Sequence, residues 1–264
     1  MSYDFHLFLA IASFVLGTVI GSFLNVVIVR LPREESIVSP RSRCPKCGSP
    51  IGWYDNIPIL SYLFLRGHCR YCGSGISPRY FVTELVTGLL FLAMFLKWGL
   101  TPSLGVYWIF CAAMIAIFWI DLEHMIIPDV ISLNCIPVGI SAAIVGAIPG
   151  VDWKLSLIGT IVGTAVLWLP AEIYSRLRGI EGLGGGDIKL LGMIGAFTGP
   201  SGVLFVLFVS STIGAAVGLL GMATRRTDST TPIPFGPFLT LAALLYVLAG
   251  QEIVKWSLGA VALA

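Results

Sequence analysis

Long apolar stretches recur along the chain and predict helices that span a membrane. Seven of them approach the roughly 20 apolar residues that a helix needs to cross a bilayer core. They lie near residues 5–29, 81–96, 104–120, 127–148, 155–174, 203–223 and 238–254. An eighth stretch, residues 188–199, would reach only about 18 Å as a helix and is too short to cross alone. The pattern predicts an all-α polytopic membrane protein with about eight transmembrane helices, with seven as the alternative count.

Composition agrees with this pattern and excludes several classes of protein. Charged residues make up 11% of the 264 residues, hydrophobic residues make up 56%, and the mean hydropathy is +0.92. An ordinary soluble domain carries roughly 25% charged residues, so this chain lacks the charge to cover a soluble surface. A free cytosolic enzyme, a disordered chain and a nucleic-acid-binding protein with a basic patch are therefore excluded.

The distribution of basic residues predicts which side of the membrane each loop occupies. Eight of the 16 lysines and arginines lie between Arg30 and Arg79, and five more lie in two shorter loops on the same face. The opposite face carries Lys97, Lys154 and Lys255. Because cytoplasmic loops are enriched in lysine and arginine, the more basic face is predicted to be cytoplasmic. The first stretch has an acidic upstream flank and a basic downstream flank, which predicts an uncleaved helix rather than a signal peptide.

Residues 31–79 form the one long hydrophilic segment, and they contain two pairs of cysteines. Cys44 and Cys47 form the first pair, and Cys69 and Cys72 form the second. Two Cys-x2-Cys pairs are typical of a tetrahedral zinc site, and the glycine after each pair lets backbone amides approach the sulfurs. Four thiolates leave no open position on the metal, which favours a structural role. Disulfides are an alternative, although a cytoplasmic loop is a reducing environment, and His68 is an alternative ligand.

Seven of the 14 acidic residues gather at the predicted cytoplasmic ends of helices, although charge inside a bilayer is costly. Asp121 ends a long apolar run, and Asp187 follows three glycines and opens the stretch at 188–199. The glycines allow a sharp bend and the close approach of an extended substrate. Two carboxyl groups at one depth fit aspartyl proteolysis, in which one accepts a proton from water and the other, protonated, polarises the scissile carbonyl.

The sequence leaves other interpretations of these acids open. Helix caps and buried packing acids are alternatives for the cluster, and Asp129, which follows a proline, is expected to cap the next helix. A transporter or proton channel with intramembrane acids is the alternative function, and a non-enzymatic scaffold stabilised by zinc is another. HExxH and GxSxG motifs are missing from the sequence, and a serine–histidine relay would have to use His124.

Six short strings occur in an order and at a spacing that resemble the type IV prepilin peptidases. The strings are GSFLNVVIVRLP (21–32), both cysteine pairs with WYDNIPILSYLFLRGHCRYC, ISPRYFVTELVTGLLF (76–91), DLEHMIIPD (121–129), GGGDIKLLGMIGAF (184–197) and PFGPFL (234–239). Together they extend over nearly the whole chain. The resemblance implies that Asp121 and Asp187 are the catalytic aspartates, the second in a GxGD motif made by Gly184, Gly185, Gly186 and Asp187.

The resemblance also implies substrates and cofactors. Members of this family are bifunctional leader peptidases and N-methyltransferases of bacterial pilus and type II secretion systems. The implied substrate is a prepilin or pseudopilin whose short basic leader is removed after a glycine, and the new N-terminus is then methylated with S-adenosylmethionine. The four cysteines favour the bifunctional type, and Glu84 and Asn25 fit the methylation or substrate site. A Rossmann-type GxGxxG loop is missing, so the residues that bind the methyl donor stay unassigned.

The expected organisation has three parts. Residues 1–30 form the first transmembrane helix, residues 31–79 a cytoplasmic zinc-binding domain, and residues 80–264 a transmembrane aspartic peptidase core. The expected location is the bacterial inner membrane, with the zinc domain and the active site at the cytoplasmic face. The expected partners are prepilins or pseudopilins and the lipid bilayer, without nucleic acid. From the helix dipole we expect Asp187, at a helix N-terminus, to carry the negative charge, and Asp121, at a helix C-terminus, to hold the proton.

Overall fold

The structure is a computed structural model that describes residues 3–179, 184–224, 233–250 and 252–253. Within these residues the chain is helical, with two isolated bridges and no β-strand, so the predicted all-α fold is confirmed. The chain divides into two compact units, Met1–Leu100 and Thr101–Ala264. Glu181, Arg225, Arg226 and Lys255, which contributed to the sequence interpretation, lie outside the described residues.

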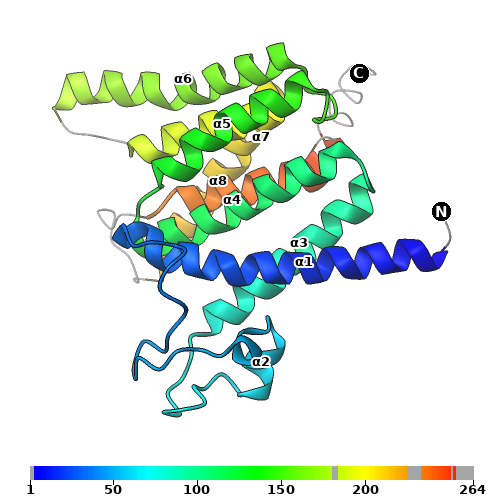
Figure 1. Cartoon of the computed structure of the whole chain (residues 1–264). Helices are drawn as coiled ribbons and strands as arrows, with labels where there is room; N and C mark the ends of the chain where they lie inside the picture. Colours follow the sequence, from blue (N-terminus) through cyan, green and yellow to red (C-terminus); the bar gives the residue numbers. More distant parts are fainter. Residues whose placement is uncertain (1–2, 180–183, 225–232, 251, 254–264) are drawn as a thin grey trace. The chain divides into compact units, whose positions relative to one another are not determined.

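The first unit pairs two long helices and carries a small domain between them in sequence. Helices α1 (Tyr3–Arg30) and α3 (Pro78–Trp98) run antiparallel (Figure 1). Glycines allow the close approach of these helices, since a Cβ at Gly17 would lie 2.8 Å from the Cα of Gly88. The connecting segment contains the 3-10 turns η1 (Leu31–Arg33) and η2 (Trp53–Asn56) and the short helix α2 (Leu60–Phe64).

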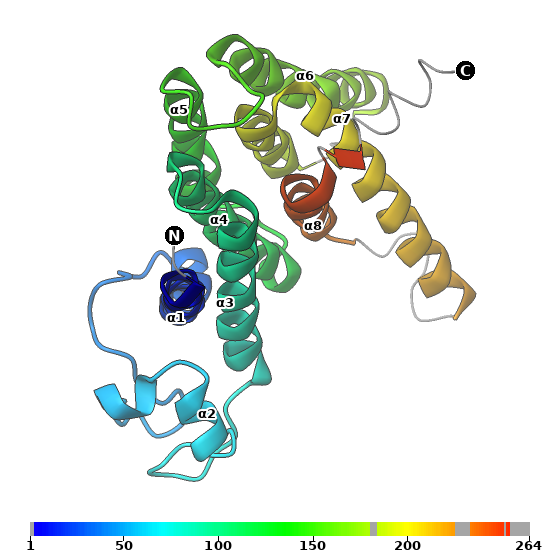
Figure 2. The same ribbon diagram turned by 90° about the vertical axis from the view of Figure 1, so that its right-hand side faces the viewer.

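The second unit is a group of packed helices in which α7 contacts three others (Figure 2). Its elements are α4 (Pro102–His124), α5 (Asp129–Ile144), α6 (Trp153–Arg178), α7 (Gly185–Ala223), α8 (Gly236–Leu245) and the π-helical turn η3 (Tyr246–Gly250). Helix α7 packs against α5, α6 and α8, and α4 packs against α8. Gly159 of α6 and Gly195 of α7 bring two backbones into direct contact, because a Cβ on either would overlap the other.

Helix α7 contains both of the apolar stretches that the sequence separated at residues 199–203. They run as one helix with a break, where Gly199 adopts φ 67° and ψ −176° and Pro200 follows. Proline lacks a backbone N–H and clashes with the preceding turn, and glycine tolerates positive φ, so the pair breaks a helix at this point. The sequence placed the break correctly, and α7 consists of two helical segments, residues 185–198 and 200–223, that meet at this kink.

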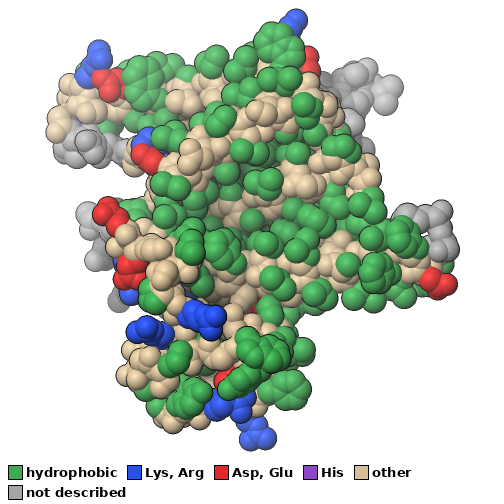
Figure 3. All heavy atoms as spheres, viewed as in Figure 1, with side chains coloured by type: hydrophobic (Ala, Val, Ile, Leu, Met, Phe, Trp, Pro, Cys, Tyr) green, Lys and Arg blue, Asp and Glu red, His purple; other side chains and the backbone are tan. Residues whose placement is uncertain are grey.

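Within the described residues, all eight predicted apolar stretches fall largely on helices, and five of these helices are long and apolar enough to cross a membrane. These five are α1, α3, α4, α6 and α7, whereas α5 and the segment Gly236–Gly250 are shorter apolar helices. Phe8, Ile11 and Val15 of α1 are exposed, and hydrophobic side chains cover much of the surface seen in Figure 3, as a lipid-facing surface requires. The chain is therefore a multi-pass membrane protein, and the count of eight spans stays a prediction.

Candidate active site and metal centre

Asp121 lies on the last turn of α4, after a run of buried apolar residues that includes Ile117 and Ile120. Met125 adopts a left-handed conformation, and its N–H donates to the Asp121 carbonyl oxygen at 2.9 Å, which ends the helix. The Asp121 residue is only 5% exposed. Its Oδ2 atom is buried and has no hydrogen-bond partner among the described residues. Leaving a buried carboxyl oxygen without a hydrogen bond costs free energy, so this atom is suited to form a hydrogen bond with a substrate or a water molecule.

Asp187 is the third residue of α7 and so lies at the N-terminal end of a helix, whereas Asp121 lies at the C-terminal end of one. Gly184 precedes the helix as its N-cap residue, and Asp187 is partly buried. Two residues later, Lys189 Nζ donates to both carboxylate oxygens of Asp129 at 2.7 Å, which ties the start of α7 to the start of α5. Asp129 therefore pairs with a lysine and makes no side-chain cap, so the expectation that it caps α5 is wrong.

The two predicted catalytic aspartates come together in the second unit, and they interact electrostatically. Residues from two further segments complete their surroundings. Gly236, the first residue of α8, faces Asp121 so closely that a Cβ there would lie 2.5 Å from Oδ2. Ile127 lies near both Gly236 and Gly186, since a Cβ on Gly236 would be 3.2 Å from its Cδ1 and one on Gly186 would be 2.9 Å from its Cβ. The site is built by the end of α4, the segment before α5, and the starts of α7 and α8.

Sequence reasoning did not single out Gly236 or Ile127 as site residues. Gly236 occurs in PFGPFL, which contributed to the resemblance as a string without an assigned role. The prolines at positions 234 and 237 were the only local signal that the chain turns into a helix there. Proximity to Asp121 depends on how α8 packs against α4, which no local pattern encodes.

The four predicted metal-ligating cysteines also come together, in the small domain of the first unit. The Sγ atoms of Cys44, Cys47, Cys69 and Cys72 all lie within 4.8 Å of one another. His68 does not belong to this group; its Nδ1 lies 2.6 Å from the Arg66 carbonyl oxygen. The cysteine set predicted from spacing is therefore the set that the fold assembles.

Each cysteine pair sits in the same backbone motif, and the two copies are offset by 25 residues. Cys44 N–H donates to the Ser49 carbonyl and Gly48 N–H donates to the Cys44 carbonyl, both at 2.9 Å. The second copy repeats these bonds from Cys69 N–H to the Ser74 carbonyl at 2.8 Å and from Gly73 N–H to the Cys69 carbonyl at 2.9 Å. Gly48 and Gly73 adopt φ 72° and 66°, values that favour glycine and explain why each pair is followed by one.

The geometry and electrostatics of the cluster fit a tetrahedral metal. A zinc ion with Zn–S distances of about 2.3 Å has S···S edges of about 3.8 Å, and Cys44 Sγ lies 3.8 Å from Cys72 Sγ. The backbone N–H groups of Cys47 and Lys46 point at Cys44 and lower the pKa of its thiol to about 6. The Ser74 hydroxyl and backbone lower the pKa of the Cys72 thiol. The Cys44 and Cys72 thiols are therefore biased toward the thiolate, which is the form that binds metal.

Glu84 and Asn25 lie in the first unit and connect its helices to the small domain and to each other. Glu84 Oε2 accepts a hydrogen bond from the Ile59 N–H at 2.7 Å. Asn25 Nδ2 donates to the Tyr80 carbonyl oxygen at 3.1 Å, and its Oδ1 is buried without a partner among the described residues. Glu84 therefore holds the residue that precedes α2, and Asn25 ties α1 to the first turn of α3.

Two family profiles match the chain in succession. The Bacterial Peptidase A24 N-terminal domain matches residues 15–98, and the Type IV leader peptidase family matches residues 108–219. The first match contains all four clustered cysteines, and the second contains both aspartates.

Several proteins with the name prepilin leader peptidase/N-methyltransferase are similar to the chain. A protein of Myxococcus xanthus is 42% identical over 241 residues, which cover 88% of this chain and 71% of that protein. A protein of Aeromonas hydrophila is 37% identical, with coverage of 93% and 92%, and one of Pseudomonas aeruginosa is 34% identical with the same coverage. No solved structure matches the chain.

Proposed function

The chain belongs to the type IV leader peptidase family, and from this premise we propose that it removes the leader of prepilins or pseudopilins and then methylates the new N-terminus. Similarity to relatives named for both activities extends over most of the chain and includes both matched domains. The transporter alternative receives no support from these relatives, because their names describe an enzyme.

The observation that carries the peptidase proposal is the pairing of Asp121 with Asp187 across α4 and α7. Asp187 lies in the first turn of α7, where the helix dipole stabilises a carboxylate. Asp121 lies in the last turn of α4, where the dipole opposes a carboxylate, and its buried Oδ2 lacks a partner in the described structure. Asp187 then accepts a proton from the attacking water, and the protonated Asp121 donates a hydrogen bond to the scissile carbonyl.

The location that best fits this function is the bacterial inner membrane, with the active site and the cysteine domain at the cytoplasmic face. The argument rests on charge, because 13 of the 16 lysines and arginines fall in segments assigned to that face. A short basic leader would remain on that side while the hydrophobic helix of the substrate enters the bilayer. The four cysteines would hold zinc as a structural ion, which folds a domain that has little apolar core.

Leader cleavage by the purified enzyme in detergent or vesicles tests the catalytic pair. We expect Asp121→Asn and Asp187→Asn each to lower the cleavage rate by at least about 100-fold, because general acid–base groups contribute about that much or more. Glu172→Gln is the matched control, since Glu172 is an acid of α6 whose carboxylate accepts a hydrogen bond from Arg176 at 2.7 Å. Cleavage at the wild-type rate by either asparagine variant would contradict the proposal.

Binding of uncleaved prepilin by the two variants tests the assignment of the proton. Asparagine resembles a protonated aspartic acid in shape and as a donor, so Asp121→Asn should bind the substrate more tightly than Asp187→Asn. The measurement is equilibrium binding of a labelled prepilin to the reconstituted variants. Equal affinity would refute the assignment while leaving the catalytic pair intact.

A further inference from the structure

Two adjoining cavities lie between α1 and the small domain, within the first unit. The first has a volume of about 440 Å³ and the second about 360 Å³. Both volumes are within the range of about 300–1,000 Å³ that is typical of small-molecule sites. Val26 of α1 and Trp53 and Asn56 of η2 line both cavities, so the two meet at these three residues.

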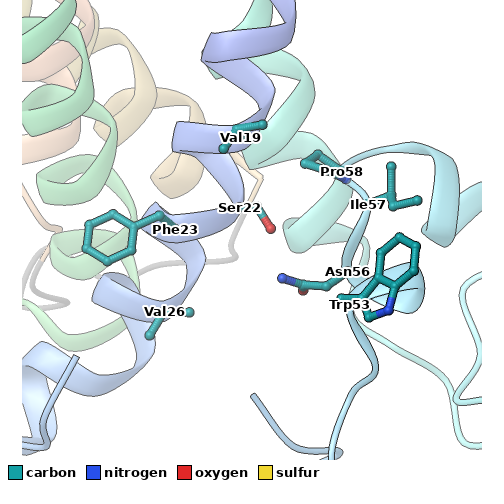
Figure 4. A pocket seen from close by; sticks show the side chains of 8 residues that line it. All are labelled: Val19, Ser22, Phe23, Val26, Trp53, Asn56, Ile57 and Pro58. Carbon is teal, nitrogen blue, oxygen red and sulfur yellow. The ribbon is translucent and has the colours of Figure 1, made fainter. Parts of the chain in front are cut away.

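The first cavity is largely apolar and lies beside the transmembrane part of α1. Val19 and Phe23 of α1 line one side, and Ile57 and Pro58 line the other. Ser22 and Asn56 point toward one another across the gap between α1 and the 53–58 segment (Figure 4). Val19 and Phe23 are themselves about half exposed, at 50% and 47%, so this cavity is accessible from the lipid side of a spanning helix.

The second cavity lies at the end of α1, where the chain leaves the apolar stretch and becomes basic. Arg30, Arg41 and Ser42 line it together with Ile37 and Val38. Arg30 donates to the backbone carbonyls of Ser36 at 2.9 Å and Pro40 at 2.7 Å, which fixes the loop that forms the outer wall. Arg41 is exposed, so its guanidinium group is available to an anion that arrives from water.

The loop that joins the two cavities is held in a strained conformation. Ile59 adopts φ 63° and ψ −55°, which is rare for a β-branched residue, and such strain concentrates at functional sites. Its N–H donates to Glu84 Oε2 at 2.7 Å, so α3 holds the loop in this shape. Ser61 Oγ accepts from the Ile57 N–H at 3.1 Å and donates to the Tyr54 carbonyl at 2.9 Å. The segment that carries Trp53 and Asn56 is therefore fixed on both sides.

We propose that these two cavities form the methyl-transfer site, with S-adenosylmethionine in the basic cavity and the N-terminal residue of the cleaved membrane helix in the apolar one. The proposal rests on the N-methylation included in the proposed function. A methyl donor is soluble in water whereas the acceptor is the end of a membrane helix, so the two must meet where an aqueous site adjoins a lipid-exposed one. Two cavities that share Val26, Trp53 and Asn56 provide this meeting point.

The residues of the basic cavity match the parts of the donor. Trp53 is 81% exposed, so its ring offers a flat surface on which adenine can stack. The Asn56 side chain supplies an amide donor and acceptor for the edge of the base. Arg41 supplies a guanidinium group for the carboxylate of the methionine part.

The transfer itself requires no acid or base from the cavity walls. The α-amine nitrogen of the acceptor forms a bond to the methyl carbon with its lone pair, while the sulfur–methyl bond breaks and its electrons stay on sulfur. The products are S-adenosylhomocysteine and a methylated ammonium, which releases a proton to water. An α-amine has a pKa of about 7.7–8.0, so about 10–20% of it is already neutral at pH 7.

Binding of S-adenosylhomocysteine to the full-length enzyme in nanodiscs tests the basic cavity without relying on turnover. Loss of one base–aromatic contact is expected to raise Kd by about 5- to 150-fold in Trp53→Ala, and Arg41→Ala should raise it at least about fivefold. Phe64→Ala is the matched control, because Phe64 is an aromatic residue of the same domain that is 83% exposed and lines neither cavity. Unchanged zinc content and leader cleavage show that the variants are folded.

The apolar cavity is tested by filling it. Val19→Trp should leave the Kd for S-adenosylhomocysteine unchanged. It should raise the KM of methylation for cleaved pilin at least about fivefold, which is on the order of the free energy of one lost apolar contact. Val15→Trp is the control, since Val15 lies one turn earlier on α1, is similarly exposed at 52%, and lines neither cavity. The expected result is a shift in KM with Val19→Trp alone.

The outcomes separate this inference from the proposed function. If the wild-type enzyme methylates but Trp53→Ala and Arg41→Ala keep the wild-type Kd, the location of the donor site is wrong and the function stands. If the wild-type enzyme neither binds S-adenosylhomocysteine nor methylates, both N-methylation and this site are refuted, whereas leader cleavage is judged separately. Photocrosslinking of S-adenosylmethionine to a peptide of residues 101–264 would also overturn the assignment.

Discussion

Gly236 provides a direct test of the geometry around Asp121. A Cβ at this position would lie 2.5 Å from Asp121 Oδ2 and 3.0 Å from its Cγ. Ordinary contacts begin at 3.4 Å, so Gly236→Ala must displace the carboxyl group by about 0.9 Å. Gly236 is the first residue of α8 and has no positive φ, so alanine suits its backbone and is the better helix former. The substitution should therefore perturb the carboxyl group rather than the fold.

The expected loss of activity follows from the size of this displacement. A misplacement of about 1 Å at a reacting group costs about 100-fold in rate, so kcat/KM for leader cleavage should fall by about that factor in Gly236→Ala. The assay is cleavage of a prepilin substrate in detergent, with thermal unfolding measured in parallel. We expect Tm to stay within a few degrees of the wild-type value, because the first turn of α8 gains rather than loses helix propensity.

Gly214→Ala is the matched control for Gly236→Ala. Gly214 is also helical, and its added Cβ would meet nothing closer than the ring of Phe238 at 3.4 Å, an ordinary contact. Its cleavage rate should stay within about twofold of wild type. If Gly236→Ala cleaves as fast as Gly214→Ala, then either α8 does not pack on Asp121 during the reaction or Asp121 is not catalytic, and the reasoning fails.

Three further predictions follow from other contacts. Within the GxGD motif, Gly186→Ala would place a Cβ 2.9 Å from Ile127 Cβ and should reduce the rate of leader cleavage at least about tenfold. The control is Gly185→Ala, whose Cβ would meet no described atom within 4 Å and which should be tolerated. Equal cleavage rates for the two variants would contradict the contact with Ile127. Cys44→Ser and Cys72→Ser should each lose most of the bound zinc, measured by elemental analysis. The control Cys111→Ser, in the buried part of α4, should retain its zinc. Unchanged zinc content in the first two variants would point to other ligands. Lys189→Met removes the exposed ion pair with Asp129 and should lower the free energy of unfolding by less than about 1 kcal/mol. The rate of leader cleavage should be largely retained. A loss of cleavage as large as that of Asp187→Asn would give Lys189 a role in the chemistry.

The cysteine domain shows how far spacing alone can predict a site. Two Cys-x2-Cys-Gly repeats specify the local turns, because each glycine permits a positive φ and each turn directs backbone N–H groups at a sulfur. Those two local motifs need only to face each other to bring four sulfurs within 4.8 Å. The four cysteine ligands could thus be predicted from local chemistry. His68 could be excluded as a ligand only from the structure, where its ring lies against the Arg66 carbonyl.

The cavities beside α1 could not be predicted in this way. Trp53 and Asn56 lie in a string that contributed to the resemblance without an assigned role, and their importance arises because the strained turn at Ile59, held by Glu84 from α3, places them against Val26. Interactions between residues so distant in sequence depend on how α1 and α3 pair through Gly17 and Gly88. The resemblance indicated both Glu84 and the string that contains this loop, but the sequence did not indicate that one holds the other.

The sequence by itself determined the helical, membrane-embedded character of this protein and its two sets of chemical residues. Long apolar runs specify helices because backbone groups in lipid must bond within their own segment, and the scarcity of charge makes Asp121 and Asp187 conspicuous. Only the tertiary structure decided that Gly236 and Ile127 surround those aspartates, that Asp129 pairs with Lys189, and that two stretches join into α7. These features depend on packing between helices, and packing is set by the shapes of surfaces distant in sequence rather than by any local pattern.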